Sequence, residues 1–193
     1  ASPPLIRSAV RPRKQMWYRI ADYTLDEARR FLLEDFSKVL RRTKYLYVET
    51  KPREDIGFGF FEPILMCLCW CDFLGALRAG DVTIGNTKRI KSFVDNVLGE
   101  VNPRYRDVSD RLVSVYRHGT VHAYAPAGSF KVRAFDVDQH LSIDGAMLVI
   151  SVQQLVDDML AAVKLFAQTL VDDVGSAAPG TLGAFNAARH QLG

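Results

Sequence analysis

Apolar residues recur at steps of three and four along most of the chain, a spacing that places them on one face of an α-helix. The clearest run covers residues 25–43, where basic side chains occupy the other faces. Thr24 precedes this run and Glu27 follows three positions later, a capping-box sequence that marks a helix start. The same spacing predicts further helices over residues 62–79, 87–98, 103 to the segment around 117, and 152–173.

Residues with strong local preferences mark several helix ends. Gly80 and Gly99 are predicted to stop the second and third helices, because glycine readily adopts the conformation that closes a helix. Asn86 and Ser151 are predicted to cap the helices that follow them, and Pro103 to begin the fourth.

The apolar spacing changes from helical to alternating within residues 130–150. Asp144-Gly145 lies inside this stretch and is typical of a hairpin turn between two short strands. Residues 45–48 are predicted to be briefly extended between the first two helices. The pattern therefore predicts a mainly α fold, an up-down helical bundle of about five helices with a small β-hairpin insertion.

The length of the chain and its charge distribution indicate how the chain is organised. At 193 residues one domain is the default, and 48% hydrophobic with 24% charged residues is ordinary for a globular protein. The net charge of +3 is too small to indicate nucleic-acid binding. We expect a basic N-terminal arm over residues 1–23, which lies along phosphates or is simply solvated, a helical domain over 24–174, and a flexible tail or short helix over 175–193.

Residues 56–77 form the most apolar segment, and charged side chains argue against a membrane span. Glu62 and Asp72 would each cost roughly 3 kcal/mol within a bilayer, and Pro63 suits the first turn of a helix. The segment is therefore predicted to lie buried, at the centre of the bundle or at a dimer seam.

Cys67, Cys69 and Cys71 fall inside this apolar segment in a C-x-C-x-C arrangement. This spacing is not that of a usual zinc site, and on a helix Cys67 and Cys71 share a face from which Cys69 points away. Buried structural thiols are predicted. Reduced thiols and the lack of a signal-peptide pattern lead us to expect a cytoplasmic protein.

The densest cluster of groups suited to chemistry comprises Arg117, His118 and His122. The two histidines are four positions apart and share a helix face, and Gly119 permits a bend that could bring Arg117 towards them. Arginine offers a planar fork of donors to a phosphate, and histidine can transfer a proton near neutral pH.

Arg117-His118-Gly-Thr-Val-His122 resembles the Arg-polar-x-x-x-His motif of the HEPN superfamily (higher eukaryote and prokaryote nucleotide-binding domains). The resemblance implies an all-helical, homodimeric domain in which Arg117, His118 and His122 form a composite site across the dimer. It also implies metal-independent cleavage of RNA without a cofactor, leaving 2′,3′-cyclic phosphate ends. Arg111, Tyr116 and Tyr124 are the expected substrate-binding residues, because arginine binds phosphates and aromatic rings stack on bases.

Two alternatives remain open at this stage. The motif could have only a structural role, in a non-catalytic homodimeric helical module that binds RNA or another partner. An interior histidine more often has its hydrogen bonds made within the protein than acts as a catalyst. His118 and His122 could instead supply two ligands of a metal site. This would be an alternative to the metal-free site that the resemblance implies. The candidates for the third ligand are Asp136, Asp138 and His140.

Overall fold

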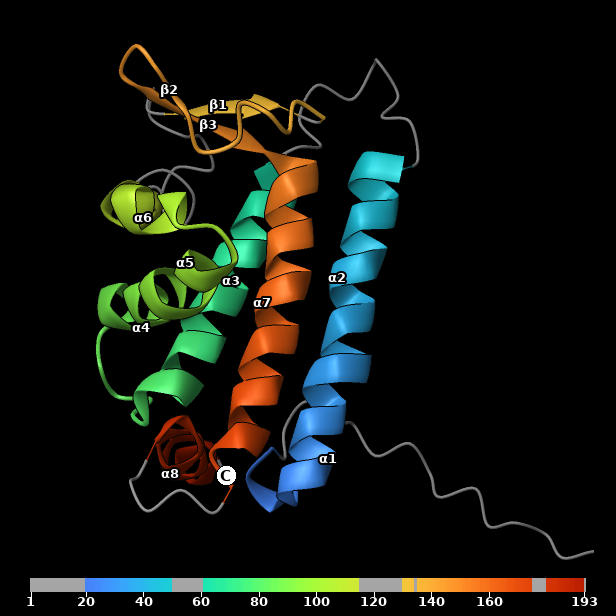
Figure 1. The fold of residues 1–193 in the computed structure, drawn as a ribbon, viewed down its shortest axis with the longest axis vertical. Coiled ribbons are helices and arrows are strands. Elements are labelled where there is room, and N and C mark those ends of the chain that lie inside the picture. Colours follow the sequence, from blue (N-terminus) through green and yellow to red (C-terminus); the bar gives the residue numbers. More distant parts are fainter. Residues whose placement is uncertain (1–19, 50–60, 115–129, 134, 175–179, 193) are drawn as a thin grey trace, which may run out of the picture.

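The computed structural model describes residues 20–49, 61–114, 130–133, 135–174 and 180–192, and it confirms a mainly helical fold with a small sheet (Figure 1). The helices are α1 (Leu25–Arg30), α2 (Ser37–Lys44), α3 (Phe61–Ala79), α4 (Asn86–Phe93), α5 (Gly99–Val101), α6 (Arg104–Ser114), α7 (Val152–Asp172) and α8 (Thr181–Gln191). The strands are β1 (Phe130–Arg133), β2 (Ile143–Asp144) and β3 (Met147–Ser151).

The first helical segment is longer than its sequence predicts. The capping box is confirmed: Thr24 Oγ1 accepts from the Glu27 amide at 3.2 Å, and Glu27 Oε2 accepts from the Thr24 amide at 2.9 Å. π-Helical turns follow α1 and α2, so the chain stays helical to Glu49. The prediction of an extended segment over residues 45–48 is wrong, because the helical turn carries Val48 into the core.

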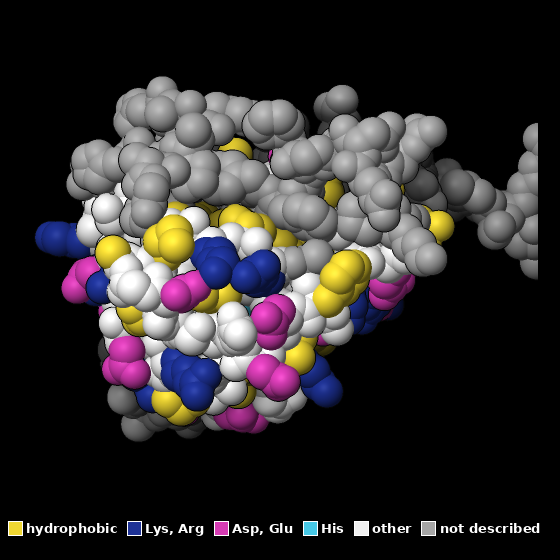
Figure 2. All heavy atoms as spheres, turned by 90° about the horizontal axis from the view of Figure 1, so that it is seen from above, with side chains coloured by type: hydrophobic (Ala, Val, Ile, Leu, Met, Phe, Trp, Pro, Cys, Tyr) yellow, Lys and Arg dark blue, Asp and Glu magenta, His cyan; other side chains and the backbone are white. Residues whose placement is uncertain are grey.

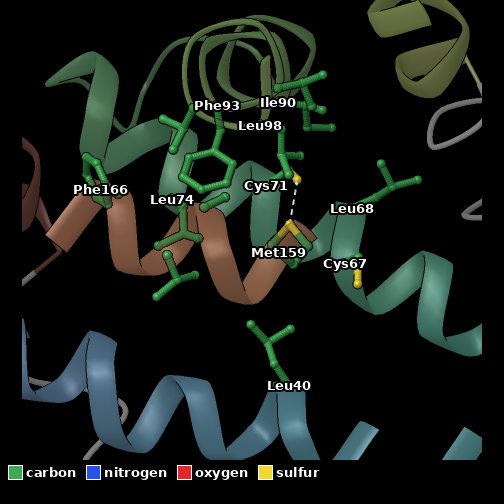
Figure 3. Close-up of a cluster of buried hydrophobic side chains, with 14 of the residues drawn as sticks. Leu40, Cys67, Leu68, Cys71, Leu74, Ile90, Phe93, Leu98, Met159 and Phe166 are labelled. Carbon is green, nitrogen blue, oxygen red and sulfur yellow. Dashed lines mark hydrogen bonds between the residues drawn. The ribbon is translucent and has the colours of Figure 1, made fainter. Parts of the chain in front are cut away.

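The hydrophobic core lies among the three long helical segments, with α7 packed against both α2 and α3 (Figure 1). Figure 3 shows Leu40 from α2, Leu74 from α3, Phe93 from α4 and Met159 from α7 converging on one cluster. The Cys71 thiol lies 3.6 Å from the Met159 sulfur within it. In the described part of the chain, no helix combines the length and apolar composition needed to cross a bilayer.

The cysteines of α3 divide as the helical spacing predicts. Cys67 and Cys71 are buried, and burial raises the pKa of Cys67 to about 12 and that of Cys71 well above its usual 9.0. Cys69 is exposed, so the prediction of buried thiols is confirmed for two of the three residues. Neither buried thiol is a reactive nucleophile, because nucleophilicity requires the thiolate.

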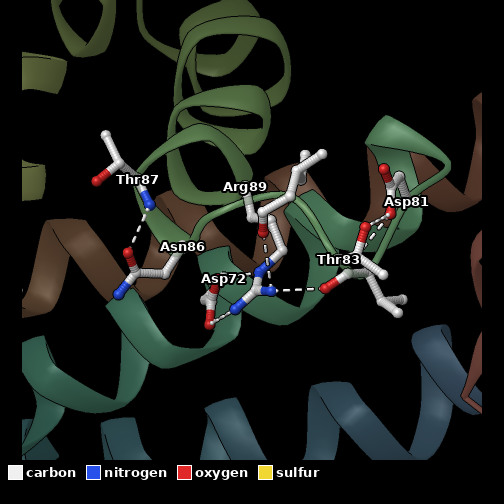
Figure 4. A network of polar contacts seen from close by, with 8 residues as sticks. Asp72, Asp81, Thr83, Asn86, Thr87 and Arg89 are labelled. Carbon is white, nitrogen blue, oxygen red and sulfur yellow. Dashed lines mark hydrogen bonds and ion pairs between the residues drawn. The ribbon is translucent and has the colours of Figure 1, made fainter.

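Polar contacts fix the corner between α3 and α4 (Figure 4). The Arg89 guanidinium binds both carboxylate oxygens of Asp72, at 2.6 and 2.9 Å, and donates to the carbonyls of Val82 and Ile84 at 2.7 and 3.0 Å. Gly75 allows this close approach, because a Cβ atom there would lie 1.8 Å from the Arg89 carbonyl oxygen. This cluster therefore has a structural role.

Two of the predicted helix ends differ from the structure. Gly80 closes α3 with a φ of 79°, as predicted. The helical conformation does not end at Gly99, as predicted, but continues through it to Val101. Gly85 rather than Asn86 occupies the cap position of α4, and the Asn86 side chain accepts only from the next amide.

The sheet covers one end of the bundle (Figure 1), and its order is β1-β3-β2. The predicted hairpin turn is confirmed: β2 and β3 are antiparallel, and Gly145 between them has a φ of 62°. The hairpin prediction is incomplete, because β1 adds a parallel strand that pairs Phe130 with Leu148. Ser151 then caps α7 by accepting from the Gln154 amide at 3.4 Å, as predicted.

Candidate functional site

α6 separates an apolar face from a charged one. Tyr105, Val108, Leu112 and Val113 are buried, and this spacing of three and four residues is what makes the segment an amphipathic helix. The opposite face carries exposed charges, which are Arg104, Arg106, Asp107, Asp110 and Arg111. Arg106 pairs with Glu100 and Asp110 pairs with Lys91, so these two side chains are held by neighbouring elements.

Arg104 and Arg111 line a groove of about 460 Å³ between α6 and the segment 141–143. The two arginines are seven positions apart, about two helical turns or ~10.5 Å along one face. Within the described part of the chain neither forms an ion pair, and Arg111 donates only to the Ala146 carbonyl, at 3.3 Å. Asp107 also lines the groove and offsets part of their charge.

Figure 2 looks down on the end of the molecule that carries the sheet. Basic, acidic and apolar side chains lie side by side on the described part of this surface. The lining of the groove itself combines Arg104 and Arg111 with the apolar Val108, Leu141 and Ile143, which suits a ligand that carries both anionic and apolar groups.

The second wall of the groove turns sharply at Leu141. Its φ of 61° lies in the left-handed region, which costs a bulky L-residue roughly 1–3 kcal/mol. Backbone hydrogen bonds hold this conformation: the Leu141 amide donates to Val149 at 2.8 Å, and the Val149 amide donates to Ser142 at 2.9 Å. The Leu141 side chain is buried, and Ser142 and Ile143 follow it along the wall.

A buried hydrogen-bond network joins the two walls beneath the surface. His140 Nδ1 accepts from the Ser151 amide at 3.1 Å, so the neutral ring carries its hydrogen on Nε2. Nε2 donates to Tyr105 Oη at 2.9 Å, and this hydroxyl donates to Asp158 Oδ2 at 2.9 Å. Gln154 donates to the other carboxylate oxygen at 2.8 Å. Each side chain of this network therefore has hydrogen-bond partners.

Burial shifts the protonation equilibria of this network. It lowers the pKa of His140 from 6.5 to about 4, an effect to which the Arg104 cation adds. Burial raises the pKa of Asp158 above 3.8, against the hydrogen bonds from Gln154 and Tyr105, and raises the pKa of Tyr105 well above 10.0. His140 is thus neutral at pH 7 and acts as a structural residue.

These contacts exclude His140 as the third ligand of the suggested metal site. One ring nitrogen accepts from Ser151 and the other carries hydrogen, so neither offers a free lone pair. Across the described ranges there is no group of three histidine, cysteine, aspartate or glutamate side chains that could hold a metal ion.

The residues of the Arg-polar-x-x-x-His motif lie outside the described part of the chain. This applies to Arg117, His118 and His122 and to the expected substrate-binding residues Tyr116 and Tyr124. Arg111 is described and lines the groove, and its role in binding a substrate stays a prediction. The motif follows α6 directly in sequence, with Arg117 three positions after Ser114.

Sequence reasoning overlooked the opposite wall and the network that supports it. One signal could have revealed the network: Asp158 lies three positions after Leu155 and four before Ala162, on the apolar face of α7. A carboxylate at such a position requires buried donors. The order of the chain alone does not show that those donors include Tyr105.

Comparisons of the chain with protein-family models, with curated proteins and with solved structures give no match. Any function must therefore be argued from the groove and from the motif.

Proposed function

We propose that this protein binds RNA in the groove between α6 and residues 141–143 and cleaves it, without a metal ion, at Arg117, His118 and His122. The observation that carries the proposal is the position of Arg104 and Arg111. Both line the groove without an ion pair in the described part of the chain, on the helix that immediately precedes the motif. Guanidinium groups that lack a carboxylate partner are well suited to phosphates.

Chain connectivity links the groove to the motif. Arg117 stands only three positions after Ser114, the last residue of α6, so the motif follows in sequence the helix that carries both arginines. We propose that a strand whose phosphates contact Arg104 and Arg111 also reaches the motif. Tyr116 and Tyr124 flank the motif in sequence and would stack on bases there.

The proposed chemistry is attack of a ribose 2′-oxygen on the adjacent phosphorus. The 2′-hydroxyl gives its proton to a general base as its oxygen bonds to phosphorus and closes a 2′,3′-cyclic phosphate. The bond to the 5′-oxygen breaks, and this leaving oxygen takes up a proton from a general acid. His122 would act as general base or acid, and Arg117 would stabilise the charge that builds on the phosphate. His118 would orient one of these groups.

A homodimer is part of this proposal. The general base and the general acid must act on opposite sides of the phosphorus, and one chain supplies a single His122. Two copies facing each other would supply both groups.

The decisive experiment measures cleavage of a labelled single-stranded RNA in excess EDTA. We expect 2′,3′-cyclic phosphate ends from the wild type and a loss of cleavage of at least about 100-fold in His122→Ala. His190→Ala, which changes an exposed histidine of α8, is the matched control and should cleave normally. Circular dichroism and sedimentation should show that both variants remain folded with the same oligomeric state. Undiminished cleavage by His122→Ala would refute the catalytic assignment.

The described lining of the groove also favours a second candidate, RNA binding without cleavage. Its residues include no histidine or cysteine, so these positions supply no group that ordinarily titrates near pH 7. Tight binding of intact RNA by a wild-type protein that never cleaves it would favour this non-catalytic module.

A further inference from the structure

Three exposed charges of α6 line the groove and form no ion pair with another described residue. They are Arg104, Asp107 and Arg111. The other exposed charges of the helix, Arg106 and Asp110, are both paired with neighbouring elements. The described part of the fold therefore neutralises the charges beside the groove and leaves those inside it for a ligand.

Asp107 stands between the two arginines on one face of the helix. It lies three positions after Arg104 and four before Arg111, spacings at which opposite charges commonly pair on a helix. Arg30 and Glu34 form such a pair at 3.5 Å elsewhere in the chain. Asp107 pairs with neither arginine, so its carboxylate also remains available to accept hydrogen bonds from a ligand.

The order of these charges along α6 describes the ligand that fits them. A cation, an anion and a cation require two anionic groups with a hydrogen-bond donor between them. The backbone of RNA repeats this order, because a ribose 2′-hydroxyl lies between successive phosphates and can donate. The backbone of DNA has the phosphates but lacks the hydroxyl.

The carboxylate of Asp107 makes this difference count. An anion in the groove repels any phosphate that binds beside it, which opposes binding unless the ligand donates a hydrogen bond in return. Hydrogen bonds to an ionised acceptor are stronger than neutral ones. A site built to bind a hydroxyl therefore rejects the analogue that lacks it, since the unpaired carboxylate then remains beside the phosphates.

We infer that Asp107 accepts a hydrogen bond from a ribose 2′-hydroxyl while Arg104 and Arg111 bind the flanking phosphates, so that the groove selects RNA over DNA. The inference rests on the proposed function, because it takes the ligand of the groove to be RNA. The hydroxyl belongs to a nucleotide other than the one cleaved at the motif. A groove of about 460 Å³ is within the size range of small-ligand sites, so a single nucleotide unit can serve as the probe.

The test compares adenosine 3′,5′-bisphosphate with its 2′-deoxy form by isothermal titration calorimetry on the full chain. The two compounds differ only in the 2′-hydroxyl, and neither contains the phosphodiester bond that the proposed nuclease breaks. We expect the wild type to bind the ribose compound at least about tenfold more tightly, the effect of one hydrogen bond to a charged group.

Three variants assign this selectivity to a residue. Asp107→Ala should reduce the ratio of the two affinities to below about twofold and should bind the deoxy compound more tightly than the wild type does, because the repulsion is gone. Asp110→Ala is the matched control, since it makes the same charge change on the same helix outside the groove lining, and should keep the wild-type ratio. Arg111→Ala should weaken both compounds by a similar factor.

The ratio also separates recognition from a structural role of Asp107. This residue lies in the first turn of α6, where a carboxylate stabilises the helix terminus. Loss of that stabilisation would change the binding of both compounds alike. Equal binding of the two compounds by the wild type, or an unchanged ratio in Asp107→Ala, would overturn the inference. Failure of the wild type to bind either compound would overturn it as well.

This test distinguishes the inference from the nuclease proposal. If the wild type never cleaves RNA but prefers the ribose compound through Asp107, the nuclease proposal fails and the inference stands. If the wild type cleaves RNA but binds both bisphosphates equally, the inference fails and the nuclease proposal stands.

Discussion

Mild acid should destabilise the protein through His140. The imidazole is 2% exposed and stays neutral because burial lowers its pKa to about 4. Protonation would also remove the lone pair on Nδ1 that accepts from the Ser151 amide. Folding therefore requires the neutral ring, whereas the unfolded chain takes up a proton below about pH 6.5.

The sign and size of this effect follow from proton linkage. Between pH 6.5 and about 4 the unfolded state binds more protons, so stability is full above 6.5 and falls as the pH falls. At ~1.36 kcal/mol per pKa unit the whole window amounts to about 3 kcal/mol, of which about 2 kcal/mol is lost between pH 7 and pH 5. Asp158 has the opposite sign, because its folded pKa is raised above 3.8 and protonation at low pH favours the folded state.

The measurement is urea unfolding of the wild type and of His140→Asn at pH 7 and pH 5. The asparagine can accept from the Ser151 amide but does not titrate, so the other titrating groups cancel in the comparison. We expect the wild type to lose about 2 kcal/mol more than the variant between the two pH values. Equal losses within about 0.5 kcal/mol would show that His140 is not held neutral by burial.

Two further predictions test the packing of α3. Gly75→Ala should lower the free energy of unfolding in urea by about 3 kcal/mol or more, because the new Cβ would lie 1.8 Å from the Arg89 carbonyl oxygen. Gly85→Ala is the control and should lower it by less than about 1 kcal/mol, because a Cβ there has no neighbour within 4 Å. A thiol reagent should modify exposed Cys69 in the native protein and reach Cys71 only on unfolding. Similar stability of the two alanine variants, or equally rapid labelling of both thiols, would contradict the packing described here.

Features that depend on a few neighbouring residues could be predicted. The capping box at Thr24, the cap at Ser151 and the turn at Gly145 all occur as predicted, since each relies on contacts within three or four positions. The opposite faces of Cys67 and Cys69 follow from helical geometry in the same way.

Features that depend on distant partners could not be predicted. Residues 45–48 form a helical turn because Val48 packs into a core built by other elements. His140 resembled a potential ligand in sequence, but the hydroxyl that binds it comes from Tyr105 on another helix. The arrangement of Arg117 and His122 stays a prediction, because both lie outside the described residues.

Local patterns along the chain were enough to predict a mainly helical protein, the starts of most helices, and a charged helix face at Arg111, close in sequence to Arg117. The folded structure was needed to show that Arg104 and Arg111 face residues 141–143 across a groove, and that β1 pairs in parallel with β3. The two sets of features differ in the range of the interactions that produce them. Helix spacing and caps act over one or two turns, whereas a groove wall or a strand partner depends on which distant segments bury their apolar faces together.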